Sequence, residues 1–445
     1  MAGFSKFPAK VLAQLRLLST DPQQFFSNRY YSRHPLEFER KLLDIERFEL
    51  PNITIDPAMS EHPSLNVMLP AVRPVMTGGP NTAVNMAVQI AASGVPVRLV
   101  AMDEKLEPGR DWFRRYLRDL TGSDEGLSGL SIGHCCDPEA PLPIGSNDMF
   151  LATYWTTASR IGHCLRLTNI KEFIYLIQDF EPAFYPWSSN YALALATYDL
   201  KFRPIINESM LADFLRMSGS GRFADPGFIE RGAVFEPAVD RRYFYSGSRP
   251  GNAPRRLLFY ARPGRNMRGL GFEALRLAAA DPVFAEGWEF QSLGSDNLPV
   301  MTLSNGKQIR PAPWMAFSEY AKLIRESDIL LCLMLSPHTS YPSLEMVASG
   351  GITITNTFAT KTKDRLQQIS SNIIAAPPDS KQIAACLVEA GNRITTGHDP
   401  AAAFTMPRDW PTALAHVTAR ILEIFQENRR RKEFCANSPT FEIEV

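Results

Sequence analysis

The sequence predicts an α/β protein made of two doubly wound domains in tandem. Apolar runs of β-strand length alternate with helical patterns along most of the 445 residues. Some of these runs, such as 328–335, are continuously apolar, which is typical of parallel strands buried on both faces. The alternation stops at a polar stretch rich in Gly, Pro and Ser, 246–254, and then begins again, as expected of an interdomain linker.

The first series opens with a βαβ unit. A strand is predicted over 64–70, a glycine turn over 77–82, a helix over 83–93 and a second strand over 95–101. Further strands are predicted over 148–153, 171–179 and 204–207.

The second series follows the linker. Its predicted strands cover 255–261, 288–293, 328–335 and 351–356. Its predicted helices cover 269–280 and 317–326, and a third helix begins at Ser343. We therefore expect a helical extension over 1–60, a first domain over 61–245, a second domain over 246–405 and a C-terminal segment over 406–445.

The N-terminal extension leaves two interpretations open. Val11, Leu12, Leu15 and Leu18 follow helical spacing, which favours a helix packed on the first domain. The alternative is peripheral contact with a membrane surface through basic residues, namely Lys6, Lys10, Arg16, Arg29 and Arg33.

Composition excludes several classes of function. Lys plus Arg and Asp plus Glu both total 47, so the net charge is zero and a nucleic-acid-binding role is not expected. No apolar run approaches the roughly 20 residues of a membrane helix, and the N-terminus lacks a signal-peptide pattern, so we expect a cytoplasmic protein. The six cysteines show no metal-binding spacing, and the adjacent Cys135 and Cys136 are poorly placed to chelate one ion. No metal is therefore expected.

The segment 335–351 carries the clearest functional signal. A buried strand leads through a Ser/Pro-rich turn into a helix, which brings backbone N–H groups to the carboxyl edge of a sheet, where phosphate binds. The N–H groups from Ser340 through Tyr341 to Ser343 are the predicted phosphate ligands. Glu345, in the first turns of the helix, could accept a hydroxyl of a sugar or ribose. His338 adds a titratable group, so the segment predicts a nucleotide-sugar site.

Arginines gather after the strand 255–261. Arg262, Arg265 and Arg268 fall within seven residues between that strand and a helix, and guanidinium groups match phosphate oxygens. We favour a diphosphate site there over a solvated surface loop, because the loop follows the carboxyl end of a strand.

Two further loops belong to the first domain. Gly78 and Gly79 would let backbone approach an acceptor, although a plain tight turn is an equal alternative. Asp179 and Glu181 end a predicted strand and are expected to face the same crevice, where either could accept a proton from an acceptor hydroxyl. The alternative for this pair is a capped helix start with aromatic core packing.

Several of these motifs, taken in order, resemble retaining glycosyltransferases of family GT4, which have the GT-B fold. Val234–Phe244 is similar to the family's hinge motif, and Arg262 with Arg268 is similar to its diphosphate-binding pair. The stretch 320–331 is similar to its approach to the last buried strand, and 410–421 to a closing helix that crosses back to the first domain.

Two strings, 178–187 and 336–345, resemble a narrower group, the WsaF-type rhamnosyltransferases of bacterial surface glycans. This resemblance implies dTDP-L-rhamnose as donor and a rhamnosyl-containing acceptor. We expect that acceptor to be a glycan or lipid-linked glycan, and we expect no metal cofactor if the arginines and a helix N-terminus supply the positive charge. The resemblance also implies a role for Glu345 on the ribose and for Arg262 in catalysis. The family's motif has two glutamates eight positions apart, and Pro337 stands where the first would be.

Two other functions stay open from the sequence. Pro337 favours a non-catalytic glycan- or nucleotide-binding protein with a decayed site, whereas Glu345 and the arginines favour an enzyme. An enzyme that uses a UDP- or GDP-sugar is the third hypothesis.

Overall fold

The structure, a computed structural model, describes residues 18–23, 26, 49–76, 78–109, 111–122, 127–247, 253–262, 266–295 and 298–437, the last nine by their backbone. It divides into two units, one of residues 1–47 and 187–190, the other of residues 48–186 and 191–445. Both large sheets belong to the second unit. The basic residues predicted to face a membrane lie outside the described residues, as do Val11, Leu12 and Leu15.

The first sheet has seven parallel strands in the order β4-β3-β2-β6-β7-β8-β9. Side chains alternate between its two faces: in β2, Val67 and Leu69 belong to one apolar cluster and Met68 to the other. The strands are β2 (Leu65–Leu69), β3 (Val97–Ala101), β4 (Leu130–His134), β6 (Met149–Ala152), β7 (Phe173–Ile177), β8 (Phe202–Asn207) and β9 (Ala233–Phe235).

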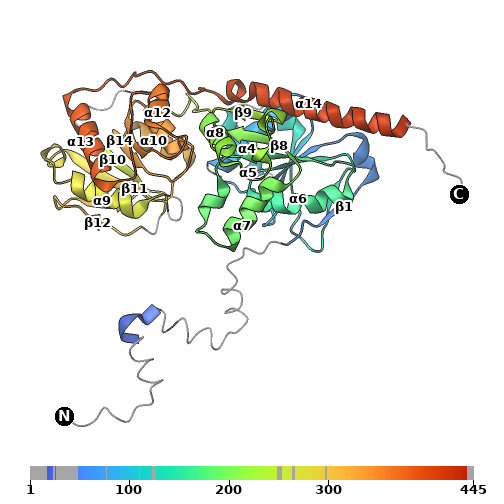
Figure 1. Ribbon diagram of the computed structural model, residues 1–445, viewed down its shortest axis with the longest axis horizontal. Helices are drawn as coiled ribbons and strands as arrows, with labels where there is room; N and C mark the ends of the chain where they lie inside the picture. Colours follow the sequence, from blue (N-terminus) through green and yellow to red (C-terminus); the bar gives the residue numbers. More distant parts are fainter. Residues whose placement is uncertain are drawn as a thin grey trace, which may run out of the picture. The chain divides into compact units, whose positions relative to one another are not determined.

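Helices cover both faces of the first sheet (Figure 1). On one face pack α4 (Gly79–Ala92), α5 (Asp111–Thr121) and α14 (Trp410–Asn437). On the other pack α6 (Trp155–Leu167) and α8 (Ser209–Ser218). A two-stranded parallel ribbon pairs β1 (Ile53–Ile55) with β5 (Leu142–Ile144), and α7 spans Ser189–Ala196.

The second sheet also has seven strands, in the order β12-β13-β11-β10-β14-β15-β16, and only β12 is antiparallel. Its strands are β10 (Arg255–Tyr260), β11 (Trp288–Leu293), β12 (Met301–Thr302), β13 (Gln308–Pro311), β14 (Ile329–Cys332), β15 (Ile352–Asn356) and β16 (Ile373–Ala376). One face is covered by α9 (Arg268–Ala278) and α13 (Ser380–Thr396). The other is covered by α10 (Phe317–Arg325), α11 (Tyr341–Ala348) and α12 (Lys363–Ile369).

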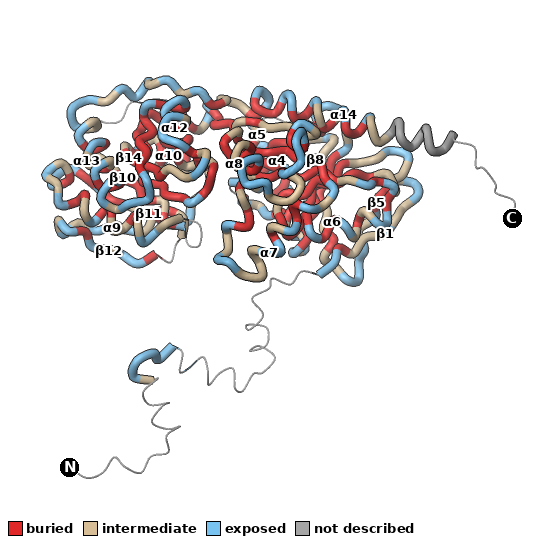
Figure 2. Tube along the Cα trace, in the orientation of Figure 1, coloured by how far each residue is buried: buried red, intermediate tan, exposed pale blue. Residues whose placement is uncertain are grey.

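Burial follows this layered plan, with the buried chain concentrated in the strands and in the helix faces that touch them (Figure 2). Strand order reverses between β2 and β6 in the first sheet and between β10 and β14 in the second. Ligands of open parallel sheets bind at such switch points, beyond the carboxyl ends of the strands. The loops that follow β2, β10 and β14 are therefore the places to look for a site.

The prediction of two doubly wound sheets is confirmed, and every predicted strand overlaps an observed one. The prediction of helix up to residue 60 is wrong for 53–55, because the alternating Ile53-Thr54-Ile55 forms β1. The last helix of the predicted site begins at Tyr341 instead of Ser343, since Pro342 is well suited to a first helical turn. The domain boundaries at 60, 245 and 405 stay a prediction.

Helix α14 returns from the second sheet to the first, as the family resemblance implied. Its apolar residues Leu414, Val417 and Ile421 are fully buried in the same cluster as α4 and β2. Within the described residues, no helix combines the length and apolar character that crossing a bilayer requires.

Leu414→Ala should therefore destabilise the first sheet although the residue comes from the far end of the chain. We expect a loss of about 2–4 kcal/mol in the free energy of unfolding, because a buried leucine leaves a cavity. Urea denaturation measures it. The exposed Ala419→Ser on the same helix should change the free energy by less than about 1 kcal/mol, and equal losses in the two variants would contradict the packing described.

Candidate active site

A cavity lies between the carboxyl edges of the two sheets. The first sheet contributes Gly78 and Asn81 to its wall, and the second sheet contributes Arg262, Tyr341 and Glu345. Gly78 and Arg262 lie in the loops after β2 and β10. Asn81 lies in α4, and Tyr341 and Glu345 lie in α11, the helices that follow β2 and β14 at the two switch points. The structure thus brings together residues from three of the four sequence segments predicted to carry function.

Glu345 is held by one strong partner. It is 7 % exposed, and the hydroxyl of Tyr320 donates to its Oε2 at 2.6 Å. Burial raises the pKa of Glu345 to about 7, against the opposing effect of the Tyr320 hydrogen bond. Among the described residues none donates to Oε1, so this oxygen is available to a ligand in the cavity.

One end of the cavity is aromatic. Tyr243, Phe244, Phe317 and Tyr320 line it and form a chain of ring contacts with centroids 5.0–6.4 Å apart. Trp314 also lines this end and is 62 % exposed. Flat, weakly polar surfaces of this kind suit stacking of a nucleobase.

The arginines are only partly brought together. Arg262 lies directly after β10, is exposed and lines the cavity. Gly294 makes this position accessible: it has a φ of 100°, and a Cβ there would lie 2.9 Å from the Arg262 backbone nitrogen. Arg268 is exposed at the start of α9 and is not among the residues that line the cavity, while Arg265 lies outside the described residues.

Glycine stands at position 78 because the backbone there adopts a conformation that other residues rarely take. Gly78, the residue before α4, has a φ of 58°, and a Cβ there would meet no atom within 4 Å. The backbone is therefore open to the cavity at this point. The carbonyl of Gly79 accepts from Gln178 Nε2 at 3.1 Å, which ties the turn to the end of β7.

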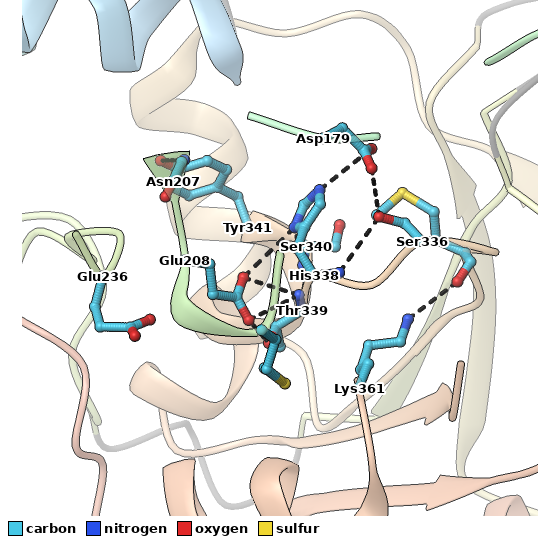
Figure 3. Close-up of polar contacts among 12 residues, drawn as sticks. Asp179, Asn207, Glu208, Glu236, Ser336, His338, Thr339, Ser340, Tyr341 and Lys361 are labelled. Carbon is cyan, nitrogen blue, oxygen red and sulfur yellow. Dashed lines mark hydrogen bonds and ion pairs between the residues drawn. The ribbon is translucent and has the colours of Figure 1, made fainter. Parts of the chain in front are cut away.

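The loop before α11 is bound to the first sheet by buried polar contacts (Figure 3). The hydroxyl of Ser336 donates to Asp179 Oδ1 at 2.5 Å. His338 lies between two carboxylates, with Nε2 3.4 Å from Asp179 Oδ2 and Nδ1 3.6 Å from Glu208 Oε2. Asp179 thus contacts the loop of the second sheet and is not among the residues that line the cavity, and its role towards an acceptor stays a prediction.

Glu208 is the functional candidate that sequence reasoning missed. It follows β8, is 1 % exposed, and accepts from Thr339 N at 2.9 Å and Thr339 Oγ1 at 2.6 Å. The available signal was a carboxylate placed directly after the predicted strand 204–207, the same position that Asp179 holds on the neighbouring strand. The residue before it, Asn207, donates from Nδ2 to the Tyr341 hydroxyl at 3.1 Å. That hydroxyl is also 2.7 Å from Thr82 Oγ1.

Two predicted features of the loop are corrected by these contacts. The N–H of Ser340 points at His338 Nδ1, 3.0 Å away, and that of Ser343 donates to the carbonyl of Ser340; of the three expected phosphate-binding residues, Tyr341 alone lines the cavity. The reason is the turn itself, whose left-handed Ser340 (φ 77°) folds these groups back on the loop. Ser343 is fully buried instead of lining the cavity, and its carbonyl accepts from Thr353 Oγ1.

Glu181 does not share a crevice with Asp179. Its Oε2 accepts from the Trp155 backbone N–H at 2.6 Å and from the Tyr175 hydroxyl at 3.0 Å. The carboxylate therefore caps the first turn of α6 inside the first half of the protein. This geometry matches the structural alternative for the pair and gives no support to an acceptor-binding role for Glu181.

The electrostatics of the loop centre on His338. Burial alone would lower the pKa of His338, but the carboxylates of Asp179 and Glu208 raise it to about 9. The N–H of Ser340 pointing at Nδ1 suits a neutral ring, whereas two flanking carboxylates suit a charged one. We favour the charged ring because two carboxylates outweigh one peptide dipole. Among the described residues no cluster of three or more His, Cys, Asp or Glu side chains could hold a metal ion.

Comparison with known proteins identifies a family. Residues 64–208 match the family model described as "WsaF, N-terminal domain", and residues 255–388 match "WsaF, C-terminal domain". Together they cover more than half of the chain. The O-antigen biosynthesis protein RfbC of Myxococcus xanthus is 34% identical over 236 residues, which are 49% of this chain and 16% of RfbC. The chain thus spans less than a fifth of that relative's length.

Solved structures share the fold. Alr3699/HepE of Anabaena, solved in complex with UDP-glucose, has a TM-score of 0.53 at 10% identity and covers 84% of this chain and 100% of its own. The same protein with UDP and glucose gives a TM-score of 0.55 at 10% identity, over 82% and 100% of the two chains. The GT-B fold that the resemblance implied is confirmed.

The position of His338 predicts how stability depends on pH. A folded-state pKa of about 9 against 6.5 for the unfolded chain adds stability that is complete below pH 6.5 and lost as pH rises through 9. His338→Gln should remove this fall in the free energy of unfolding, roughly 1–3 kcal/mol. Urea denaturation at a series of pH values between 6 and 9.5 measures it. The exposed His62→Gln should keep it. Because Lys361 titrates with the opposite sign in part of this range, the decisive comparison is between variants: a His338→Gln protein that keeps the wild-type pH profile would contradict the charged cluster.

Proposed function

The chain belongs to the WsaF family of glycosyltransferases, and on that premise we propose that it transfers a sugar from a nucleotide donor to a glycan. The observation that carries the proposal is one cavity lined by Glu345, Arg262 and Gly78, residues of three separate segments that meet only in the folded protein. The aromatic end, the open oxygen of Glu345 and the guanidinium of Arg262 match the three parts of a nucleotide: base, sugar and phosphates.

The donor is oriented by these three features. Its base stacks in the aromatic end near Tyr243 and Phe317, and its ribose donates a hydroxyl to Glu345 Oε1. The diphosphate lies at Arg262, where a guanidinium can bind two oxygens at once.

The state of Glu345 favours a deoxyribose. Ribose offers two neighbouring hydroxyls, and a carboxylate binds both best when both of its oxygens are open. Tyr320 already donates to Oε2, which leaves Oε1 for one hydroxyl. A nucleotide with a 3′-hydroxyl alone, such as dTDP, satisfies this arrangement without leaving a buried hydroxyl unpaired.

For the transferred sugar we propose L-rhamnose, added to a bacterial surface polysaccharide. The support is the family and the likeness of half of the chain to an O-antigen biosynthesis protein. Pro337, where related motifs have a glutamate, removes one hydroxyl acceptor from the sugar subsite, as suits a deoxysugar. A lipid-linked acceptor would bring the protein to a membrane surface from the cytoplasmic side.

The reaction needs charge stabilisation more than covalent chemistry. The acceptor oxygen forms a bond to the anomeric carbon while the bond from that carbon to the diphosphate oxygen breaks, and the diphosphate leaves with the electron pair. Arg262 stabilises the negative charge that develops on this leaving group, so no metal is required. The hydroxyl proton would pass to Asp179, which does not line the cavity in this structure and would first have to give up its hydrogen bond with Ser336.

Arg262→Ala should weaken binding of dTDP about 10- to 100-fold, because it removes the cation facing the diphosphate. Isothermal titration with dTDP, UDP and GDP measures this, with EDTA present since no metal is expected. Arg276→Ala, exposed on α9, is the matched control and should bind like the wild type. Binding of no nucleotide by the wild type would favour a non-catalytic glycan-binding protein, and a preference for UDP or GDP would change the donor.

If the site prefers a deoxyribose, the wild type should bind dUDP about 5- to 10-fold more tightly than UDP, since the two nucleotides differ only in the 2′-hydroxyl. Tyr320→Phe should narrow this ratio, because it frees Glu345 Oε2 for a second hydroxyl. The ratio within each variant is its own control for general damage to the site. Equal affinities of the wild type for the two nucleotides would refute the argument.

A further inference from the structure

Backbone strain is concentrated at one place in the molecule. Among the described residues, three non-glycine residues have a left-handed φ: Glu208 (87°), Ala359 (48°) and Ser340 (77°). Glu208 follows β8 of the first sheet, Ser340 precedes α11 of the second, and Ala359 lies two residues before Lys361. Such conformations persist only where the surrounding structure enforces them, and they gather at functional sites. Here all three belong to segments that meet around the loop 336–340.

Two bonds from one residue hold this loop. The carboxylate of Glu208 accepts from both the N–H and the hydroxyl of Thr339, at 2.9 and 2.6 Å, and both residues are fully enclosed (Figure 3). Charge-assisted bonds of this length are about twice as strong as neutral ones. They connect the carboxyl edge of the first sheet to the turn that starts α11.

Opposite charges reinforce the contact. Asp179 and Glu208 come from the first sheet, and His338 and Lys361 come from the second. Lys361 is 0% exposed, donates from Nζ to the carbonyl of Met334 at 3.0 Å, and is influenced by both carboxylates. Its burial lowers the pKa of Lys361 to about 8, against the effect of those carboxylates. A buried charge left without its counterion is strongly unfavourable, so the four groups depend on one another.

We propose that Glu208 is a positioning residue for glycosyl transfer: by holding Thr339 it fixes the entry to α11 and keeps the two sheets closed over the donor. Two residues beyond Thr339 lies Tyr341, whose hydroxyl is bonded to Asn207 and Thr82 and which lines the cavity. One turn further lies Glu345. Glu208 therefore controls the placement of two cavity residues through the backbone. This role rests on the proposed transferase function.

Glu208 acts at a distance from the reacting atoms. It is not among the residues that line the cavity, and its hydrogen bonds go to Thr339. Its contribution is to closure, which excludes water from an activated donor. Loss of the contact should therefore allow water to compete with the acceptor, an effect that simple unfolding of part of the population would not produce.

Glu208→Gln tests this directly, because glutamine keeps the shape and one acceptor oxygen but removes the charge. With dTDP-L-rhamnose as donor and a rhamnosylated glycan as acceptor, kcat should fall about 10- to 100-fold, and the Kd for dTDP should rise by a smaller factor because Glu345 is less well placed. The ratio of hydrolysed to transferred donor should rise. Hydrogen exchange of the 336–345 amides should accelerate in the protein without ligand.

Two further variants keep the test decisive. Thr339→Val removes the hydroxyl donor with little change in volume. It should lower kcat, raise the ratio of hydrolysed to transferred donor and accelerate exchange of the 336–345 amides, each by a smaller factor than Glu208→Gln. Asp148→Asn is the matched control: this carboxylate is equally buried, but its partners Ser64 and Asn66 belong to the first sheet. It should reduce stability and leave the partition ratio and the exchange of 336–345 unchanged.

The outcomes separate the inference from the proposed function. If the wild type binds no nucleotide and transfers no sugar, the transferase proposal fails, and hydrogen exchange alone decides whether Glu208 holds the loop. The positioning role would be overturned if the 336–345 amides of Glu208→Gln exchanged at the wild-type rate. It would also be overturned if the wild type is active and Glu208→Gln has the same kcat and the same ratio of hydrolysed to transferred donor. Accelerated exchange of the same size in Asp148→Asn would also overturn it.

Discussion

The contact between Glu208 and Thr339 is the constraint on which the arrangement of the cavity depends. Two parallel sheets that face each other through their carboxyl edges present loops to one another, and loops alone do not define a rigid wall. A buried carboxylate on two donors of the opposite loop supplies a defined distance and direction. Asp179 repeats the device one strand away through Ser336. The cavity residues Tyr341 and Glu345 inherit their positions from these contacts.

The same contacts explain why the start of α11 differs from a simple phosphate-binding helix end. A helix N-terminus attracts anions, and here the anion beside it is a protein carboxylate from the other sheet. The positive charge that faces a diphosphate must then come from elsewhere in the cavity, and Arg262 at the end of β10 is positioned to provide it. Glu345, further along α11, stays available for a sugar hydroxyl.

Sequence patterns predicted the sheets well because buried parallel strands are continuously apolar. They pointed to Arg262, Gly78 and Glu345 because each lies in the loop or helix that follows a strand, and all three line the cavity. They failed where the decisive fact was three-dimensional. Glu181 and Asp179 are two residues apart, yet one caps α6 and the other crosses to the second sheet. Glu208 was missed because its partner lies 131 residues away, and the folding back of Ser340 depends on a backbone conformation that its residue type does not announce.

We propose that a nucleotide diphosphate lies in the cavity between the sheets, with its deoxyribose hydrogen-bonded to Glu345 and its phosphates bound by Arg262. A crystal structure of the protein with bound dTDP tests this most directly. We expect a deoxyribose hydroxyl within hydrogen-bond distance of Glu345 Oε1, while the Tyr320 hydroxyl still donates to Oε2. We expect the diphosphate to contact the Arg262 guanidinium. A nucleotide bound outside this cavity, or inside it with neither Glu345 nor Arg262 in contact, would contradict it.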